Sequence, residues 1–543
     1  MNSSLLRRAA DADVCLLLEG TFPYVRGGVS SWVDGMIRAF PDIRFAIAFI
    51  GSRREDYGDP AFALPENVVH FTEQFLYEQK PADHETAHEI AGDADAFAHS
   101  ARLHAAWRSA DAADGTALMT EVAKLIGDDG PLNEKAFLSS RAAWNYIVDQ
   151  YRENCTDPSF TDYFWTVRIM HQPLWQLERM TRTLPPARIY HTISTGYAGF
   201  LGTLLHHRTG RPLIVSEHGI YTKERKIDLL QSDWISDNRG AFEKDVSKIS
   251  YFRELWVRFF EALGRLSYDA ADEIVALYEA NRKRQIADGA NAAITQNIPN
   301  GVDVKSLSTL VERRTPGKRR VVALVGRVVP IKDVKTFIRG IFIASRTMPD
   351  IVAWIVGPEE EDRDYAEECR ALAQSLGLAD RIEFHGFKRM DEMLPSIDLI
   401  ALTSISEALP LVVLEGFAAG VPAVTTDVGA CRQLIEGDGA EDAALGAAGA
   451  IVPIANPAAF AQAVLDMLGN EAQWERAQQA AIARVHRFYT KEKMIERYRA
   501  LYEKLRALPE RERRRLDKAK GCPMHAGGAA HAPSSTSSTP GAR

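Results

Sequence analysis

The feature that most constrains the fold is an alternation of short, leucine-rich or β-branched runs with longer helical stretches. Ten such runs are candidate strands: residues 14–19, 44–51, 187–192, 212–218, 273–278, 320–327, 351–357, 381–386, 399–404 and 422–427. Runs that are apolar on both faces and alternate with helices are typical of parallel sheets in α/β proteins. Because 543 residues are too many for one core, we expect two or more domains, with ligands beyond the carboxyl ends of the strands.

The alternation stops between about residues 75 and 185. Segments 84–107 and 136–151 there show helical spacing without a strand pattern, so we expect a helical insertion in the first domain. The basic, proline-containing stretch at residues 311–320 indicates a domain boundary close to it. Residues after about 520 are of low complexity, and we expect them to be disordered.

Composition excludes several classes of protein. The net charge of −8 argues against a general nucleic-acid binder. The five cysteines are scattered, which fits a reducing cytosol better than a disulfide framework. The N-terminal residues lack the features of a signal peptide, and no run approaches the length of a membrane span. We therefore expect a cytoplasmic protein, in which any association with the inner membrane comes through a partner or a surface.

The stretch SISEALPLVVLEGFAAGVP, residues 404–422, predicts an anion site at a helix start. Pro410 suits the first position of a helix, and Gly420 suits its end. The free amides of Leu411 and Val412 would then point out of the helix, where they stabilise an anion by roughly 0.3–2 kcal/mol.

Two glutamates with seven residues between them flank this helix start. Glu407 lies in the loop beside the anion site, and Glu415 lies inside the helix among apolar residues. A carboxylate there is costly unless it is hydrogen-bonded, and the two hydroxyls of a ribose are fitting donors. The pattern predicts a clamp for a nucleoside diphosphate. A plain amphipathic helix with a solvated Glu415 fits the spacing equally well.

Other strand ends carry further candidates. Arg327 follows one strand and Lys332 lies at the start of the next helix, so both cations could bind a diphosphate. Gly27 and Gly28 precede an N-terminal helix and would allow backbone amides to approach a ligand. A solvated basic loop and a simple turn are the respective alternatives.

Several motifs together resemble retaining GT-B glycosyltransferases of family 4. They are QNIPNGVD at residues 296–303, VGRVVPIKD at 325–333, the paired glutamates, and GFAAGVPAVTTDVGACRQLI at 416–435. The segments 17–33 and 216–225 resemble the PelF-type glycosyltransferases of Pel exopolysaccharide synthesis more narrowly. The resemblance covers about residues 12–505. The chain departs from the family at Ala408, where Gly is frequent, and at Gly416, where Ala is frequent.

The resemblance implies a GT-B fold, in which two Rossmann-like domains with parallel sheets face each other across a cleft. It places acceptor contacts in the first domain, the nucleotide-sugar in the second, and a final helix that crosses back to the first. The expected segments are an N-terminal domain at residues 1–310 with its insertion at about 75–185, a donor domain at 311–490, the crossing helix at 491–520 and a disordered tail at 521–543.

The resemblance also implies roles for single residues. Glu415 would bind the ribose hydroxyls, Arg327 and Lys332 the diphosphate, and Glu407 would lie near the transferred sugar. Gly27 and Gly28 would close over the phosphates. His218 matches a strand-end histidine that contacts the sugar near the reacting carbon; a histidine satisfied at a strand end is the alternative.

The expected function is retaining, metal-independent transfer from a UDP-sugar, with UDP-glucose as the implied donor, to a saccharide acceptor during assembly of a Pel-type extracellular polysaccharide. We expect no cofactor, because the UDP-sugar is a substrate, and we expect an inner-membrane synthase and export complex as partner. An assembly or regulatory subunit that binds nucleotide-sugar with little catalysis is the alternative. A sugar-nucleotide epimerase has less support from these motifs.

Overall fold

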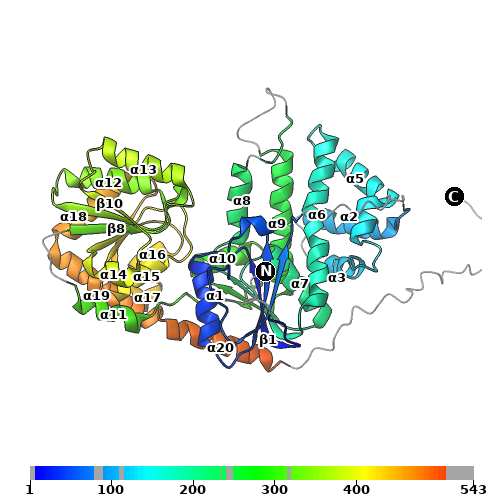
Figure 1. Cartoon of the computed structure of the whole chain (residues 1–543), viewed down its shortest axis with the longest axis horizontal. Helices are drawn as coiled ribbons and strands as arrows, with labels where there is room; N and C mark the ends of the chain where they lie inside the picture. The colour runs from blue at the N-terminus through cyan, green and yellow to red at the C-terminus, as the bar shows by residue number, and fades with distance from the viewer. Residues whose placement is uncertain are drawn as a thin grey trace, which may run out of the picture.

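The computed structural model describes residues 7–78, 90–108, 115–232, 234–239, 249–314 and 320–508. Two parallel sheets, each covered by helices, form two domains that lie side by side (Figure 1). The predicted tail at 521–543 and the segment 509–520 lie outside the described residues, as does half of the basic stretch at 311–320. The predicted architecture of two Rossmann-like α/β domains is confirmed. The predicted domain limits stay a prediction.

The N-terminal domain contains a seven-stranded sheet in the order β3-β2-β1-β4-β5-β6-β7. Every neighbouring pair of strands in it is parallel. The strands are β1 (Ala12–Glu19), β2 (Phe45–Gly51), β3 (Val68–Phe75), β4 (Ala187–Thr192), β5 (Leu213–Glu217), β6 (Glu273–Ala276) and β7 (Thr295–Asn297). The helices that connect them outside the insertion are α1 (Gly28–Ala39), α7 (Tyr197–Thr209), α8 (Tyr221–Gln231), α9 (Tyr251–Ala270) and α10 (Glu279–Ala287), with the short η2 (Arg54–Asp56).

The C-terminal domain contains a six-stranded parallel sheet in the order β10-β9-β8-β11-β12-β13. Its strands are β8 (Arg320–Val325), β9 (Ile351–Val356), β10 (Ile382–Gly386), β11 (Leu399–Leu402), β12 (Ala423–Thr426) and β13 (Gly449–Val452). Its helices are α11 (Val304–Glu312), η3 (Pro330–Lys332), α12 (Val334–Ser345), α13 (Arg363–Ser375), α14 (Met390–Met393), η4 (Leu394–Ser396), α15 (Leu411–Ala418), α16 (Cys431–Glu436), α17 (Gly439–Ala443), α18 (Pro457–Gly469) and α19 (Glu471–Phe488).

All ten predicted strands are present, and three further strands were missed. The missed strands β3, β7 and β13 each form an edge of a sheet. An edge strand buries less of its surface than a central strand, so its sequence is less apolar. The strand β3 includes His70, Thr72, Glu73 and Gln74, and β7 is only three residues long.

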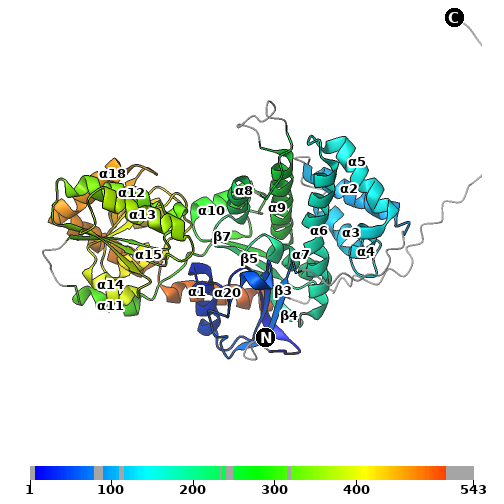
Figure 2. The ribbon, with the colours of Figure 1, turned by 45° about the horizontal axis from the view of Figure 1, so that its top comes forward.

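The described residues between β3 and β4, in the region predicted to be a helical insertion, contain five consecutive helices. They are α2 (Ala94–Arg108), α3 (Gly115–Leu125), α4 (Glu134–Ser139), α5 (Arg141–Asn154) and α6 (Phe160–Thr183). Both views show them on the side of the N-terminal domain that is remote from the C-terminal domain (Figures 1 and 2). Their apolar side chains, such as Phe137 and Met170, share one core cluster with those of α7 and α9.

The last described helix, α20 (Lys491–Arg506), leaves the C-terminal domain and packs beneath the first sheet (Figure 1). Tyr498 and Tyr502 are buried there. The hydroxyl of Tyr502 lies 2.8 Å from Nδ1 of His191, whose Nε2 lies 2.8 Å from Oγ of Ser216. Burial lowers the pKa of His191 to about 3, so its neutral ring can donate one of these hydrogen bonds and accept the other.

Among the described residues, none of the helices combines the length and the apolar composition needed to cross a membrane.

The Tyr502 contact predicts a specific loss of stability. Tyr502→Phe leaves one nitrogen of the buried His191 without a partner, which should lower the free energy of unfolding by about 1–3 kcal/mol. Urea denaturation measures the change, and substitution of the exposed neighbour Glu503 by Gln serves as control. An unchanged midpoint for Tyr502→Phe would contradict the assigned contact.

Candidate functional site

Two loops at the carboxyl edge of the second sheet are joined to each other by hydrogen bonds. The hydroxyl of Thr403, directly after β11, donates to the carbonyl oxygens of Lys332 and Asp333, at 3.1 and 3.0 Å. The amide of Ile405 donates to the carbonyl of Ile331 at 2.8 Å. The loops after β8 and β11 therefore hold their side chains at one place.

Lys332 and Glu407 form an ion pair at this place. Nζ of Lys332 lies 2.5 Å from Oε1 of Glu407, which also accepts a hydrogen bond of 2.6 Å from the hydroxyl of Ser404. The side chain of Lys332 is 22% exposed and that of Glu407 is 12% exposed. Solvent therefore screens this ion pair less than it screens a pair on the surface. A ligand phosphate here would meet a positioned ammonium group.

Arg327 lies at the same strand end but has a different partner. Its guanidinium is half-exposed and pairs with the carboxylate of Glu361, at 2.5 Å. A Cβ added to Gly326, the residue before Arg327, would lie 3.7 Å from Cε of Lys332. The backbone next to Arg327 therefore lies close to the Lys332 side chain. Sequence reasoning could not find Glu361, because it follows the next strand along the chain.

The helix α15 starts beside the Lys332–Glu407 pair. Pro410 is the cap before the helix and Leu411 its first residue, so the predicted start at Pro410 is wrong by one position. The extended conformation of Pro410 accounts for the shift, because a cap residue lies outside the helical region. Gly429 lies against the loop that precedes α15, because a Cβ added to Gly429 would lie only 2.3 Å from the carbonyl oxygen of Glu407.

Glu415 lies one turn along α15 from Leu411. Leu411, Val412 and Glu415 are the partly exposed positions of α15, and positions i, i+1 and i+4 share one face of a helix. Among the described residues, no side chain makes a hydrogen bond or ion pair with the Glu415 carboxylate. Burial raises the pKa of Glu415 to about 7.

The N-terminal helix α1 begins opposite α15. Gly27 is its cap and Gly28 its first residue. A Cβ added to Gly28 would lie 3.9 Å from Cδ1 of Leu411, whereas one added to Gly27 would meet nothing within 4 Å. The starts of two helices, one from each domain, thus lie close together, and both present free amides.

His218 lies on the N-terminal side, directly after β5. Its ring packs edge-on against that of Trp32 of α1, with centroids 4.6 Å apart. Burial lowers the pKa of His218 to about 4, and its Nε2 has no hydrogen-bond partner in the structure. The ring is therefore neutral at pH 7, and its Nε2 is a buried nitrogen without a hydrogen-bond partner among the described residues.

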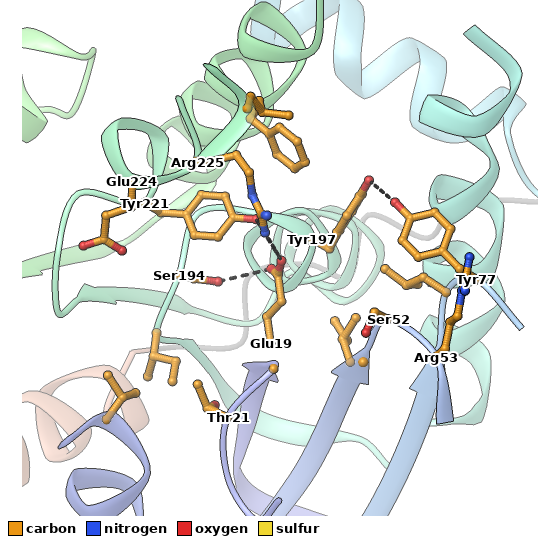
Figure 3. A pocket seen from close by; sticks show the side chains of 18 of the residues that line it. Glu19, Thr21, Ser52, Arg53, Tyr77, Ser194, Tyr197, Tyr221, Glu224 and Arg225 are labelled. Carbon is orange, nitrogen blue, oxygen red and sulfur yellow. Dashed lines mark hydrogen bonds and ion pairs between the residues drawn. The ribbon is translucent and has the colours of Figure 1, made fainter. Parts of the chain in front are cut away.

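A cavity of about 760 Å³ opens beside His218 at the carboxyl edge of the first sheet (Figure 3). The ends of β1, β2, β4 and β5 line it together with α8 and α9. Of the predicted site residues, only His218 lines this cavity. Figure 3 shows Glu224 and Tyr221 at one end, and Arg53 and Tyr77 at the other.

Glu19 is the best-connected carboxylate in the cavity. It accepts hydrogen bonds from the hydroxyl of Tyr221 at 2.8 Å and from the amide of Ala198 at 3.2 Å. The guanidinium of Arg225 lies 3.7 Å away from it and 3.0 Å from the Tyr221 oxygen. The sequence held a signal for these residues, because Glu19 ends the first predicted strand and the other two lie in the segment 216–225.

The structure thus brings some predicted residues together and separates others. Lys332, Glu407, Leu411 and Gly28 gather between the domains, with Arg327 and Val412 next to them in the chain. His218 lies in the neighbouring cavity. Their predicted roles toward a ligand stay a prediction.

Two family models match the chain. The model described as "Domain of unknown function (DUF3492)" matches residues 12–293, and the one described as "Glycosyl transferases group 1" matches residues 319–470. The first match spans more than half of the 543 residues. The two models correspond to the two sheets.

Curated relatives match less of the chain. D-inositol 3-phosphate glycosyltransferase of Mycobacteroides abscessus is 27% identical over 247 residues, which cover 44% of this chain and 52% of that relative. Exopolysaccharide phosphotransferase SCO2592 of Streptomyces coelicolor is 34% identical over 186 residues, 33% of this chain and 17% of that protein. The chain spans about half the length of the glycosyltransferase relatives that it matches, or slightly more.

Solved structures share the fold at low identity. Anabaena HepE in complex with UDP superposes with a TM-score of 0.55 at 14% identity, covering 91% of this chain and 100% of that one. Sucrose-phosphate synthase from Thermosynechococcus elongatus gives a TM-score of 0.53 at 14% identity, with coverages of 91% and 99%. These neighbours confirm the predicted GT-B fold.

The pKa of Glu415 predicts how nucleotide binding depends on pH. If the carboxylate accepts hydrogen bonds from a diol, binding favours its ionised form, so UDP-glucose affinity should rise with pH and level off above about pH 7. Below that, affinity should fall toward tenfold per pH unit, and Glu415→Gln should abolish this dependence. Calorimetry in buffers of different ionisation enthalpy measures the proton released. Affinity independent of pH in the unmodified protein would exclude the contact.

Proposed function

The chain belongs to the family described as "Domain of unknown function (DUF3492)", and we propose that it is a retaining, metal-independent glycosyltransferase. Its donor is a UDP-sugar, with UDP-glucose as the substrate that the motifs favour. The product is an extracellular polysaccharide of Pel type. The group 1 glycosyl transferase match over residues 319–470 and the UDP complex of the structural neighbour support this assignment.

One observation carries the proposal: the start of α15 adjoins the Lys332–Glu407 pair and faces the start of α1 across the domains. An anion placed here would meet amides of Leu411 and Val412, the positive end of the helix dipole and an ammonium group. Such a concentration of donors suits a diphosphate, whose β-phosphate gains negative charge as the sugar leaves. The 3.9 Å separation between Leu411 and a Cβ on Gly28 keeps the phosphates within reach of both helices.

The remaining residues take the roles that their positions allow. Glu415 receives the ribose hydroxyls, because its carboxylate shares the exposed face of α15 with Leu411. Arg327 reaches the diphosphate when it exchanges Glu361 for a phosphate, since both partners of that pair are half-exposed. Glu407 and the neutral His218 contact the transferred sugar from the two domains.

The reaction follows from this arrangement. The acceptor hydroxyl forms a bond to the anomeric carbon while the bond to the β-phosphate oxygen breaks, and the hydroxyl proton passes to the leaving phosphate. Attack from the face of the leaving group retains the configuration, and the resemblance of the motifs to retaining enzymes supports this course. Lys332 and the α15 amides stabilise the departing UDP.

The proposed setting is the cytoplasm, where the chain passes its product to a synthase and export complex at the inner membrane. The similarity of residues in this chain to an exopolysaccharide phosphotransferase of Streptomyces coelicolor supports a polymer-building role. The acceptor is a saccharide.

A thermal-shift panel tests the donor and metal assignments together. UDP-glucose at 100 times its dissociation constant should stabilise the protein by about 2.7 kcal/mol, and EDTA should leave that shift unchanged. GDP-glucose and ADP-glucose should stabilise it less. A shift that EDTA removes would refute metal independence, and a larger shift with GDP-glucose would refute the UDP assignment.

Two variants test the catalytic assignment. Lys332→Ala should lower kcat for transfer from UDP-glucose by about 100-fold or more, because it removes a donor to the leaving group. Lys335→Ala, three residues on and paired with Glu368 at the surface, is the matched control.

Glu415→Ala should weaken UDP binding about 10- to 100-fold. Binding of UDP-glucose without measurable turnover in the unmodified protein would favour the non-catalytic subunit instead.

A further inference from the structure

The cavity beside His218 has the composition of a binding site for an uncharged ring compound. Besides His218, seven aromatic side chains line it: Tyr57, Tyr77, Tyr197, Tyr221, Trp234, Trp256 and Phe260. All but Tyr57 form a connected set, with Tyr197 and Phe260 centroids 5.6 Å apart and those of Trp256 and Phe260 6.0 Å apart. Aromatic faces carry partial negative charge, and the C–H face of a sugar ring packs well against them.

An exposed tryptophan extends this lining to the mouth of the cavity. Trp234 is 64% exposed although it contacts Trp256, with ring centroids 5.5 Å apart. At about 760 Å³ the cavity lies in the range of small-molecule sites, so more than one sugar ring fits inside.

The charges in the cavity disfavour an anionic ligand. Arg225 is already paired with Glu19 and with the Tyr221 oxygen. Arg53 lies at the far end, 3.9 Å from Glu55 and largely exposed. A phosphate group inside would therefore meet the carboxylates of Glu19 and Glu224 without a free guanidinium close to them.

Glu224 is the carboxylate with hydrogen-bonding capacity left. Among the described residues, no side chain pairs with it, and its carboxylate rests against the backbone of Gly219, where a Cβ would lie 1.9 Å from Oε1. Gly219 directly follows His218, whose ring packs against Trp32 of α1, and α1 begins opposite α15. This end of the cavity, with His218, thus lies toward the proposed donor site.

We propose that this cavity holds the acceptor as an uncharged saccharide, whose reacting hydroxyl is positioned by Glu224 and whose neighbouring rings pack on the aromatic lining out to Trp234. The inference rests on the proposed function for the reaction itself. It adds the class of acceptor: a neutral oligosaccharide, and not a phosphorylated polyol.

Saturation-transfer NMR on the full chain tests the binding class without donor. Cellotriose, maltotriose and chitotriose are the neutral probes, and myo-inositol 1-phosphate is the anionic one. We expect ring-proton signals from at least one trisaccharide that Trp234→Ala weakens about tenfold, while Trp165→Ala, an exposed tryptophan outside the cavity, leaves them unchanged. Signals from the inositol phosphate alone, from none of the probes, or equal signals in both variants would overturn the proposal.

Kinetics separate the role of Glu224 from a structural one. With the bound trisaccharide as acceptor, Glu224→Ala should raise KM or lower kcat about tenfold or more, and Glu224→Gln should restore part of the loss. Asp228→Ala, one turn further along α8, is the control. UDP-glucose affinity should be unchanged in all three variants.

The two proposals fail in distinguishable ways. Absence of UDP-glucose binding would refute the proposed function. The saturation-transfer NMR result would still decide which class of ligand the cavity binds. Equal acceptor kinetics for Glu224→Ala and Asp228→Ala would overturn the positioning role even if transfer itself is observed.

Discussion

The cavity of the N-terminal domain depends on one buried carboxylate, Glu217, at the end of β5. It is 1% exposed, and burial raises its pKa while hydrogen bonds oppose the rise. Donors from four segments converge on it: the hydroxyls of Thr195 and Tyr268, the amide of Tyr221 and the side chain of Gln285. A buried carboxylate needs such partners, so these segments have one arrangement around it. His218, Gly219 and the start of α8 follow directly, and with them the shape of the cavity.

The proposed donor site is built differently, from hydrogen bonds between two loops rather than around one fully buried charge. Hydrogen bonds between the loops after β8 and β11 place Lys332 against Glu407, and Gly429 leaves room for the turn before α15. These contacts join only two short loops, so two linear motifs represent the site well. The cavity beside His218 draws its residues from many separate segments, and no short motif can represent it.

This difference decides how much could be predicted from the sequence. Central strands such as β8 are apolar throughout and were found, whereas the edge strands β3, β7 and β13 are short or polar and were not. The candidates Glu407, Glu415, Lys332 and Arg327 came from spacing at strand ends, which a parallel sheet brings to one edge. The pairing of Arg327 with Glu361 and the convergence of Glu19, Tyr221 and Arg225 depend on tertiary contacts between distant segments, which spacing does not encode.

The chain passes between the two domains twice, and the two passages touch. The amide of Val302 donates to the carbonyl of Tyr489, the amide of Lys491 donates to that of Val302, and a Cβ on Gly301 would lie 2.3 Å from the carbonyl oxygen of Thr490. The two connecting segments, at residues 301–302 and 489–491, are therefore hydrogen-bonded into a single short ribbon. Rotation of one lobe against the other has this ribbon as its pivot, and α20 turns with the N-terminal lobe.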